Sequence, residues 1–260
     1  MLRSMRTPSL RQLLQTPRPV TMAWLTSPDP LIAETIAQAG FDVVALDMQH
    51  GAIDEGEALR LLQVITGAGL PAVVRVPWNE PAAIMKALDL GAWGVIAPML
   101  EGPDDVRRLV AACRYPPLGR RSYGPTRGAA LAGAGYGARA NDEVVPIAMI
   151  ETRGALEQLD AIVQVPGLGA VFVGPADLSQ ALGGPPGADF EEGAVAEALV
   201  HIAARCAVHG VPAGLYTRSA HYARTMLRSG FRFAALGSAL QYVAQGAADA
   251  LSQVRDDATA

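Results

Sequence analysis

The sequence predicts a (β/α)8 TIM barrel, because three of its features are typical of that fold. Short apolar runs rich in β-branched residues recur along the chain, and each is followed by an amphipathic helical pattern. This alternation occurs eight times. A Gly-rich dinucleotide-binding motif does not follow the first run, which favours a closed barrel over an open doubly wound sheet. At 260 residues, half of them hydrophobic, the chain is long enough for one barrel domain spanning residues 1–260.

The predicted strands are four to six residues long and end close to polar residues. Strands of this length are common in parallel barrels, where the interior is filled by branched side chains. The eight runs cover residues 21–25, 41–46, 72–76, 94–99, 145–150, 170–173, 211–215 and 231–236.

The helices between these strands carry recognisable start and stop signals. Asp29 before Pro30 is an N-cap followed by proline at the first helical position, and Gly40 ends the same helix. Two later segments repeat the i, i+3, i+4, i+7 apolar spacing of a helix that packs on one face. Their apolar positions are Val106, Leu109, Val110 and Cys113, and Val195, Leu199, Ile202 and Cys206. We also expect an extra helix before the first strand and a helix after the last.

One connection departs from this regular pattern. Residues 115–141, between the fourth and fifth strands, form a long segment rich in Gly, Arg and Pro. Long connections of this kind are usually functional or disordered. We interpret residues 128–138 within it as a flexible loop.

The composition argues against polyanionic and membrane partners. The net charge is −4, and no stretch concentrates Lys and Arg as nucleic-acid binding requires. About 18 consecutive apolar residues are needed to span a membrane, and the sequence has no such run. The two cysteines lie in helical patterns at apolar positions, without metal-ligand spacing, so we expect a soluble protein of the reducing cytoplasm.

Two acidic residues follow neighbouring predicted strands. Glu151 ends the fifth strand and Asp177 follows the sixth. Active sites of parallel barrels lie at the C-terminal ends of the strands, so these carboxylates are expected to converge there. Two hard oxygen donors suit Mg²⁺ or Mn²⁺. The alternative is that each carboxylate caps the helix that follows it.

Strands two and three end in further candidates for chemistry. His50 is the one histidine of four at a strand end, and Asp47 three residues earlier could orient it as a general base. A structural histidine is the alternative. Arg75 lies near the end of the third strand, where a buried guanidinium requires an anion. That anion is either a substrate oxyanion or, in the alternative interpretation, Asp47 or Glu151 of the same chain.

Covalent catalysis has little support in the sequence. Lys86 is the chain's single lysine and lies within a predicted helix, which argues against a Schiff base. A weak phosphate-binding signal is present at Gly237 and Ser238, after the last strand. Met149, near the end of strand five, is interpreted as filling the barrel core or wall.

Taken together, these motifs resemble the class II pyruvate aldolases, in particular 4-hydroxy-2-oxoheptanedioate and 2-dehydro-3-deoxyglucarate aldolases. The resemblance covers most of the chain, and its strength lies in the shared order and spacing of the motifs. They are FDVVALDMQHG (41–51), VRVP (74–77), LDLGA (88–92), RYPPLGRRS (114–122), IET (150–152) and VGPADL (173–178).

The resemblance implies a divalent cation, Mg²⁺, Mn²⁺ or Co²⁺, held by Glu151 and Asp177. The carboxylate and keto oxygen of pyruvate would complete its coordination, and backbone groups near Gly174 and Ala176 would hold that carboxylate. The function implied is reversible cleavage of a 4-hydroxy-2-oxo acid to pyruvate and an aldehyde through a metal-stabilised enolate, in aromatic or sugar acid catabolism.

By the same resemblance, Arg75 stabilises the enolate oxygen. His50 moves the proton, supported by Asp47 and by Asp89 of a neighbouring subunit. Family members assemble as hexamers, trimers of dimers with exchanged terminal helices, so Arg121 and its long loop would shape the neighbouring site.

Two positions depart from the family pattern. Gln49 stands where Glu is common, and Met149 stands where several members have Gln. These changes can retune the metal site or the substrate-binding residues. Two other functions stay open: a related lyase or decarboxylase acting on a 2-oxo dicarboxylate or a CoA thioester, and a non-catalytic barrel that binds a metabolite.

Overall fold

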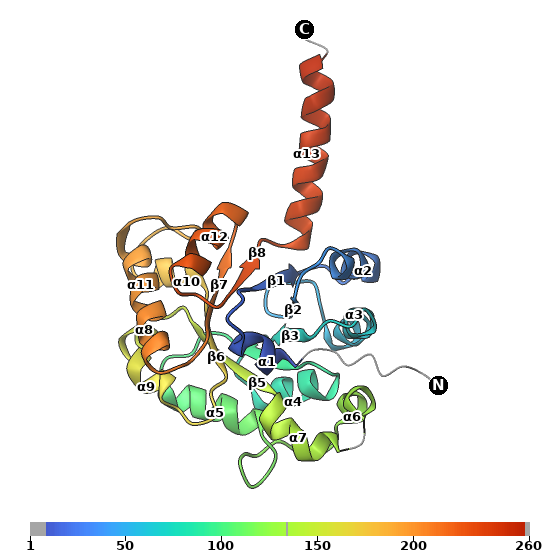
Figure 1. The fold of residues 1–260 in the computed structure, drawn as a ribbon, viewed down its shortest axis with the longest axis vertical. Coiled ribbons are helices and arrows are strands. Elements are labelled where there is room, and N and C mark those ends of the chain that lie inside the picture. Colours follow the sequence, from blue (N-terminus) through green and yellow to red (C-terminus); the bar gives the residue numbers. More distant parts are fainter. Residues whose placement is uncertain (1–8, 134, 258–260) are drawn as a thin grey trace.

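The computed structural model describes residues 9–133 and 135–257, and these fold into the predicted barrel (Figure 1). Eight parallel strands in this part of the chain close in sequential order, with the last strand paired to the first. They are β1 (Val20–Leu25), β2 (Val43–Asp47), β3 (Ala72–Arg75), β4 (Gly94–Ala97), β5 (Val145–Ile150), β6 (Ala170–Val173), β7 (Ala213–Thr217) and β8 (Phe233–Leu236).

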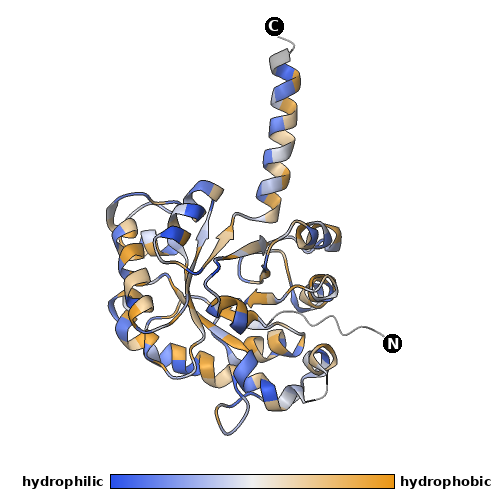
Figure 2. Cartoon of the chain, viewed as in Figure 1, coloured by the Kyte–Doolittle hydropathy of each residue, from blue (hydrophilic) through white to orange (hydrophobic). Residues whose placement is uncertain are grey.

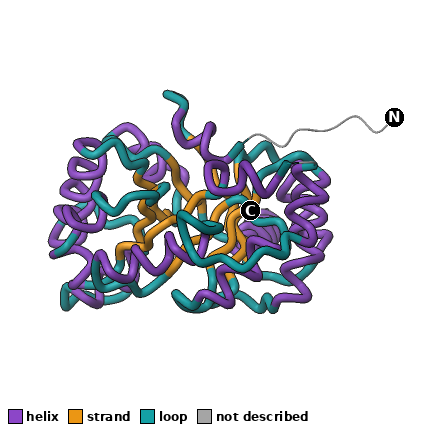
Figure 3. Tube along the Cα trace, turned by 90° about the horizontal axis from the view of Figure 1, so that it is seen from below, coloured by secondary structure: helices purple, strands orange, loops and turns teal. Residues whose placement is uncertain are grey.

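Helices surround the strands, as the view from below shows (Figure 3). They lie in the connections between consecutive strands, as the repeated βα pattern predicts. They are α2 (Pro30–Gln38), α3 (Glu55–Gly67), α4 (Pro81–Asp89), α5 (Pro103–Cys113), α6 (Thr126–Ala132), α7 (Tyr136–Glu143), α8 (Arg153–Glu157), α9 (Leu159–Val163), α10 (Pro175–Ala181), α11 (Gly193–Val208) and α12 (Ala220–Arg228).

The helix signals read from the sequence are confirmed for α2. The Asp29 side chain accepts a hydrogen bond of 2.7 Å from the backbone N–H of Leu31, and Pro30 is the first helical residue. Gly40, just after the helix, has a φ of 95°, a conformation that favours glycine. These residues therefore fix both ends of the helix.

Side chains alternate between the two faces of the barrel wall. Along β1, Met22 and Trp24 belong to the core inside the barrel, whereas Ala23 and Leu25 pack outward among the helices. The period of two is the one expected for a strand buried on both faces. The barrel is therefore a packed core rather than a channel.

A short helix, α1 (Leu10–Gln15), precedes β1 and closes the end of the barrel where the strands begin. Leu10 and Leu14 are buried and pack with the residues that fill the interior. Leu10 also lies against the first residue of β4, Gly94, where an added Cβ would be 2.7 Å from the leucine side chain. The opposite end of the barrel is left open for a site.

The expectation for residues 128–138 was wrong, because most of this segment is helical rather than flexible loop. It contributes to α6 and α7, which pack through Tyr136 and Ala140 against Trp93 and Tyr115. Small residues such as Ala and Gly made this segment look like a loop, but buried aromatic neighbours stabilise it as helix.

After β8 the chain enters α13 (Ala239–Asp257), which projects away from the barrel (Figure 1). Hydrophobic and hydrophilic residues are mixed along this helix (Figure 2). Its exposed apolar side chains include Val243, Leu251 and Val254. No helix within the described part of the chain is both long and apolar enough to cross a membrane.

Candidate active site

A pocket of about 700 Å³ opens at the C-terminal ends of the strands. This is the end at which barrel enzymes place their catalytic groups. Of the residues selected from the sequence, the pocket lining contains Asp47, His50, Arg75, Met149, Gly174, Ala176 and Asp177. Glu151 lies behind this surface and is almost completely buried.

Asp47 and Arg75 face each other at the ends of β2 and β3, where the sheet register pairs them. Arg75 donates two hydrogen bonds to the carboxylate, from Nε at 2.8 Å and from Nη2 at 2.5 Å. Burial alone would raise the pKa of Asp47, but the hydrogen bonds and charge of Arg75 outweigh it, and the pKa is lowered. The pair is therefore ionised and holds the guanidinium at the pocket wall.

Asp47 bonds the backbone of His50 and not its imidazole ring, which differs from the predicted contact. The Asp47 carboxylate accepts hydrogen bonds from the backbone N–H groups of Gln49 and His50, at 3.1 and 3.2 Å, rather than from the imidazole. Its other described partners are Arg75 and the indole N–H of Trp24. The carboxylate thus shapes the turn that carries His50, whose ring is exposed at the pocket.

Glu151 presents one bonded and one unbonded carboxylate oxygen. Oε1 accepts a hydrogen bond of 2.7 Å from the backbone N–H of Met99, a residue held at a φ of 54°. Oε2 is buried and has no hydrogen-bond partner among the described residues. Burial raises the pKa of Glu151 to about 7; the Met99 hydrogen bond opposes this shift and the charge of Asp177 adds to it.

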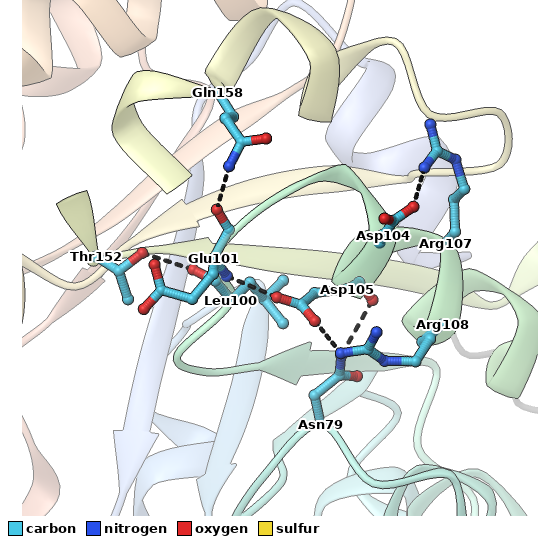
Figure 4. A network of polar contacts seen from close by, with 9 residues as sticks. All are labelled: Asn79, Leu100, Glu101, Asp104, Asp105, Arg107, Arg108, Thr152 and Gln158. Atoms are coloured by element: carbon cyan, nitrogen blue, oxygen red, sulfur yellow. Dashed lines mark hydrogen bonds and ion pairs between the residues drawn. The ribbon is translucent and has the colours of Figure 1, made fainter. Parts of the chain in front are cut away.

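Several contacts fix the backbone around this carboxylate (Figure 4). The Thr152 hydroxyl donates to the carbonyl oxygen of Leu100 at 2.6 Å, and Gln158 Nε2 donates to the carbonyl oxygen of Glu101 at 2.9 Å. The backbone N–H of Glu101 donates to Asp105 at 2.7 Å. These bonds tie the connection after β4 to the end of β5. They thereby hold in place the backbone N–H of Met99, which donates to the buried Glu151 carboxylate.

Asp177 lies in the first turn of α10, three residues after Gly174. A Cβ at Gly174 would lie 2.3 Å from Glu151 Oε2 and 2.6 Å from the Met149 methyl group, so glycine is required for this close approach. The two carboxylates and the unpartnered Oε2 fit a divalent cation that accepts oxygen ligands. In the described residues this is a pair of carboxylates, without a third His, Cys, Asp or Glu grouped with it.

The two sequence departures lie close to this site. Met149 is buried and forms part of the pocket wall, in agreement with its predicted role as filler. Gln49 has a buried Oε1 without a hydrogen-bond partner in the described part of the chain.

Asp89 and Arg121 lie outside this pocket and bind each other. Arg121 Nη2 donates to Asp89 at 2.7 Å, and the guanidinium lies over the ring of Tyr115 with its carbon 4.5 Å from the centroid. The pair joins the end of α4 to the connection before α6. Any contribution to catalysis would have to be made to another copy of the chain.

Several pocket residues were missed from the sequence. Trp24 stacks on Phe172, with 5.5 Å between ring centroids, and contacts Tyr216 edge to face at 5.8 Å. Arg218 follows β7 and also lines the pocket, together with Ser238 of the predicted phosphate-binding signal after β8. The predicted seventh strand ended at residue 215, two residues before the observed end of β7 at Thr217. Extending that prediction to Thr217 would have placed Arg218 directly after a strand end.

Comparison with known proteins adds to this geometry. The family model for HpcH/HpaI aldolase/citrate lyase matches residues 20–246. A hydroxypyruvate/pyruvate aldolase from Rhizorhabdus wittichii is 40% identical over 238 residues, covering 92% of this chain and 95% of that protein. A 2-dehydro-3,6-dideoxy-6-sulfogluconate aldolase from Pseudomonas putida is 37% identical over 219 residues, covering 83% and 84%. A solved HpcH/HpaI aldolase/citrate lyase family protein from Burkholderia cenocepacia J2315 is 31% identical, with a TM-score of 0.89, covering 96% and 100%.

Proposed function

The chain belongs to the HpcH/HpaI aldolase/citrate lyase family, and from this premise we propose that it cleaves 4-hydroxy-2-oxo acids reversibly to pyruvate and an aldehyde. The protein is an aldolase, a carbon–carbon lyase, as its relatives are. The observation that carries the specific proposal is the buried Glu151 carboxylate, with one unpartnered oxygen beside Asp177 in a pocket that also holds Arg75.

We assign Glu151 and Asp177 as the protein ligands of a divalent cation, Mg²⁺ or Mn²⁺. When bound, the cation supplies a Lewis acid that withdraws electron density from the 2-oxo acid. The buried Oε2 supports this assignment, since an unpaired carboxylate oxygen away from water is costly without a cation or a proton. The helix-capping alternative has less support, because in the described residues neither carboxylate accepts a hydrogen bond from a backbone N–H of the helix that follows it.

Arg75 is suited to stabilise negative charge on the substrate oxygen. Asp47 uses Nε and Nη2, which orients the guanidinium and leaves Nη1 available to the pocket. A donor fixed in advance costs little reorganisation when charge develops on the keto oxygen. The internal salt bridge and the oxyanion role are therefore compatible, because the first positions the group for the second.

His50 is the group available to move protons. In cleavage, the C4 hydroxyl gives its proton to the imidazole of His50. The C3–C4 bond breaks, and its electron pair forms the enolate of pyruvate. The C4 carbon departs as the aldehyde. A proton delivered to C3 then gives pyruvate, so atoms and charge balance. The exposed ring can exchange that proton with solvent.

For assembly, we propose a homo-oligomer, a hexamer, in which α13 docks on a neighbouring copy. The helix projects from the barrel and exposes Leu240, Val243, Leu251 and Val254. Exposed apolar stripes of this kind are typical of protein interfaces. Asp89 and Arg121 would then contribute to the neighbouring site.

The test is pyruvate release from a panel of 4-hydroxy-2-oxo acids, with Mg²⁺ or Mn²⁺, after chelation, and with borohydride as a Schiff-base trap. We expect release that requires the cation and resists borohydride. Release that survives chelation would overturn the metal assignment. If no member of the panel yields pyruvate, the related lyase or decarboxylase reaction, or a binding role, becomes the better interpretation.

A further inference from the structure

The side of the pocket formed by β7 and β8 contains a cationic residue that the proposed chemistry does not use. Arg218 directly follows β7 and lines the pocket together with Tyr216, Ser238 and Gln241. Its backbone is held firmly: the N–H donates to Asp189 at 2.7 Å, and the carbonyl oxygen accepts a hydrogen bond from Gln241. The position of this residue at the rim is therefore fixed by its neighbours.

Within the described part of the chain, the guanidinium of Arg218 forms no ion pair with a carboxylate. No ion pair or side-chain hydrogen bond involves it within residues 9–133 and 135–257. The Asp189 carboxylate bonds the backbone instead: its two oxygens accept from the N–H groups of Arg218 and Ser219, at 2.7 and 2.8 Å. The Arg218 side chain, at the pocket rim, is therefore not engaged in an ion pair within these residues.

The two arginines of the pocket lie on opposite sides of the barrel. Arg75 ends β3 and Arg218 follows β7, and these strands are four places apart in a closed ring of eight. Glu151 and Asp177, after β5 and β6, lie on the arc between them. A substrate held by its 2-oxo acid end near the carboxylates and Arg75 can thus extend toward Arg218.

The pocket lining also contains three aromatic side chains. Trp24 contacts both Phe172 and Tyr216, and these rings would pack along the carbon chain of a ligand. Beyond them, Arg218 and the Ser238 hydroxyl form a polar end suited to an oxyanion. In barrel enzymes the connections after strands seven and eight frequently bind anionic groups.

From this arrangement we propose that Arg218 selects aldehydes that carry a terminal anionic group, a carboxylate or a phosphate, at the end remote from the reacting carbon. This inference rests on the proposed aldolase function and specifies the substrate class of the same site. Because Arg218 is at an exposed rim, the preference arises in binding of the aldehyde, and rising ionic strength weakens it.

The test compares matched pairs of aldehydes in aldol addition to pyruvate. One pair is 4-oxobutanoate and its methyl ester, and the other is glyceraldehyde 3-phosphate and glyceraldehyde. For each pair the ratio of kcat/KM for the anionic to the neutral aldehyde is measured in the wild type, in Arg218→Gln and in Arg224→Gln. Arg224 is an exposed arginine of α12 outside the pocket and serves as the matched control.

We expect Arg218→Gln to lower the ratio about tenfold, mainly through a higher KM for the anionic aldehyde, whereas Arg224→Gln keeps the wild-type ratio. A drop confined to the first pair identifies a carboxylate as the group recognised, and a drop confined to the second identifies a phosphate. Ratios within twofold of the wild type in both pairs would overturn the inference.

A separate measurement distinguishes this failure from failure of the proposed function. Exchange of the pyruvate methyl protons for deuterium, with the cation and without any aldehyde, reports enolate formation alone. Exchange together with unchanged ratios would leave the aldolase function standing and reject the role of Arg218. Absence of both exchange and aldol product would reject the proposed function and this inference with it. Circular dichroism checks that both variants are folded.

Discussion

Asp47 and Arg75 form a buried ion pair with two hydrogen bonds at the ends of neighbouring strands, at the wall of the pocket. Both side chains are more than nine-tenths buried. Each charge is therefore stable mainly because the other is present, and the pair links the folding of the barrel to the position of the guanidinium that we propose to act in catalysis.

Asp47→Ala leaves the Arg75 guanidinium buried without its partner. We expect the free energy of unfolding to fall by about 3–5 kcal/mol, the cost typical of breaking a buried ion pair. Urea denaturation of the metal-free protein measures this change. Asp104→Ala removes a partner of the exposed pair with Arg107 and should change stability little. Equal losses in the two variants would contradict the structural role of the buried pair.

Arg75→Lys keeps the charge but loses the planar, two-bonded contact with Asp47. The ammonium is then free to move, so the oxyanion loses a donor fixed in advance. We expect kcat for pyruvate release to fall about 100-fold, with a smaller change in KM. Steady-state kinetics on the best substrate of the panel measure the effect. A kcat within threefold of the wild type would show that Arg75 does not contact the reacting oxygen.

Glu151 makes the stability of the metal-free protein depend on pH. Its pKa rises on folding from 4.5 to about 7, mainly because the carboxylate is buried. Between these values the folded protein binds more protons than the unfolded chain, so the free energy of unfolding falls as the pH rises, and the fall ends above pH 7. The Glu151→Gln variant has no titrating group at this position. The free energy of unfolding of the wild type minus that of the variant should therefore decrease as the pH rises from 4.5 to about 7. A difference that is constant with pH would contradict the burial of an ionisable Glu151.

The fold could be predicted from the sequence because its signals are local. The eight strands follow from apolar runs, and α2 follows from Asp29, Pro30 and Gly40. The failure at residues 128–138 has a different origin. Its helices depend on contacts with Trp93 and Tyr115, which are distant in the sequence, so local composition could not predict them.

In the candidate site too, features with local signals could be predicted from the sequence, and features that depend on contacts between distant residues could not. Residues directly after predicted strands, such as Glu151 and Asp177, could be selected by position alone. The preference of Asp47 for Arg75 over the His50 ring depends on the register between β2 and β3, which the sequence does not specify. Arg218 was missed because the predicted seventh strand ended at residue 215 rather than at Thr217.

Gly174→Ala tests the close packing around the two carboxylates. The added methyl group would lie 2.3 Å from Glu151 Oε2, so the carboxylate must move away from its position beside Asp177. We expect the affinity for Mn²⁺, measured by calorimetry, to fall at least about tenfold, with a stability loss of about 1–3 kcal/mol. Gly67→Ala at the end of α3, where an added Cβ meets no atom within 4 Å, should leave the affinity unchanged. Tight Mn²⁺ binding by Gly174→Ala would contradict the assigned ligand geometry.

The apolar stripe of α13 is the basis of the last prediction. Four exposed apolar residues of this helix are spaced by three, eight and three positions, so they lie along one face. They are Leu240, Val243, Leu251 and Val254. Leu251→Glu together with Val254→Glu introduces two charges on this face. If α13 docks on a neighbouring copy, burying these charges is unfavourable, and the assembly should dissociate toward the 27.1 kDa chain.

The control for α13 carries the same charge on the other side of the helix. Gln245→Glu and Gln253→Glu add two carboxylates at exposed polar positions away from the stripe, so the native mass should be kept. Sedimentation velocity compares the three proteins at equal concentration. Since both double variants add the same charge to the same helix, a change of mass in the first alone identifies the apolar face as the contact. Equal masses in all three would show that α13 does not join subunits through this stripe.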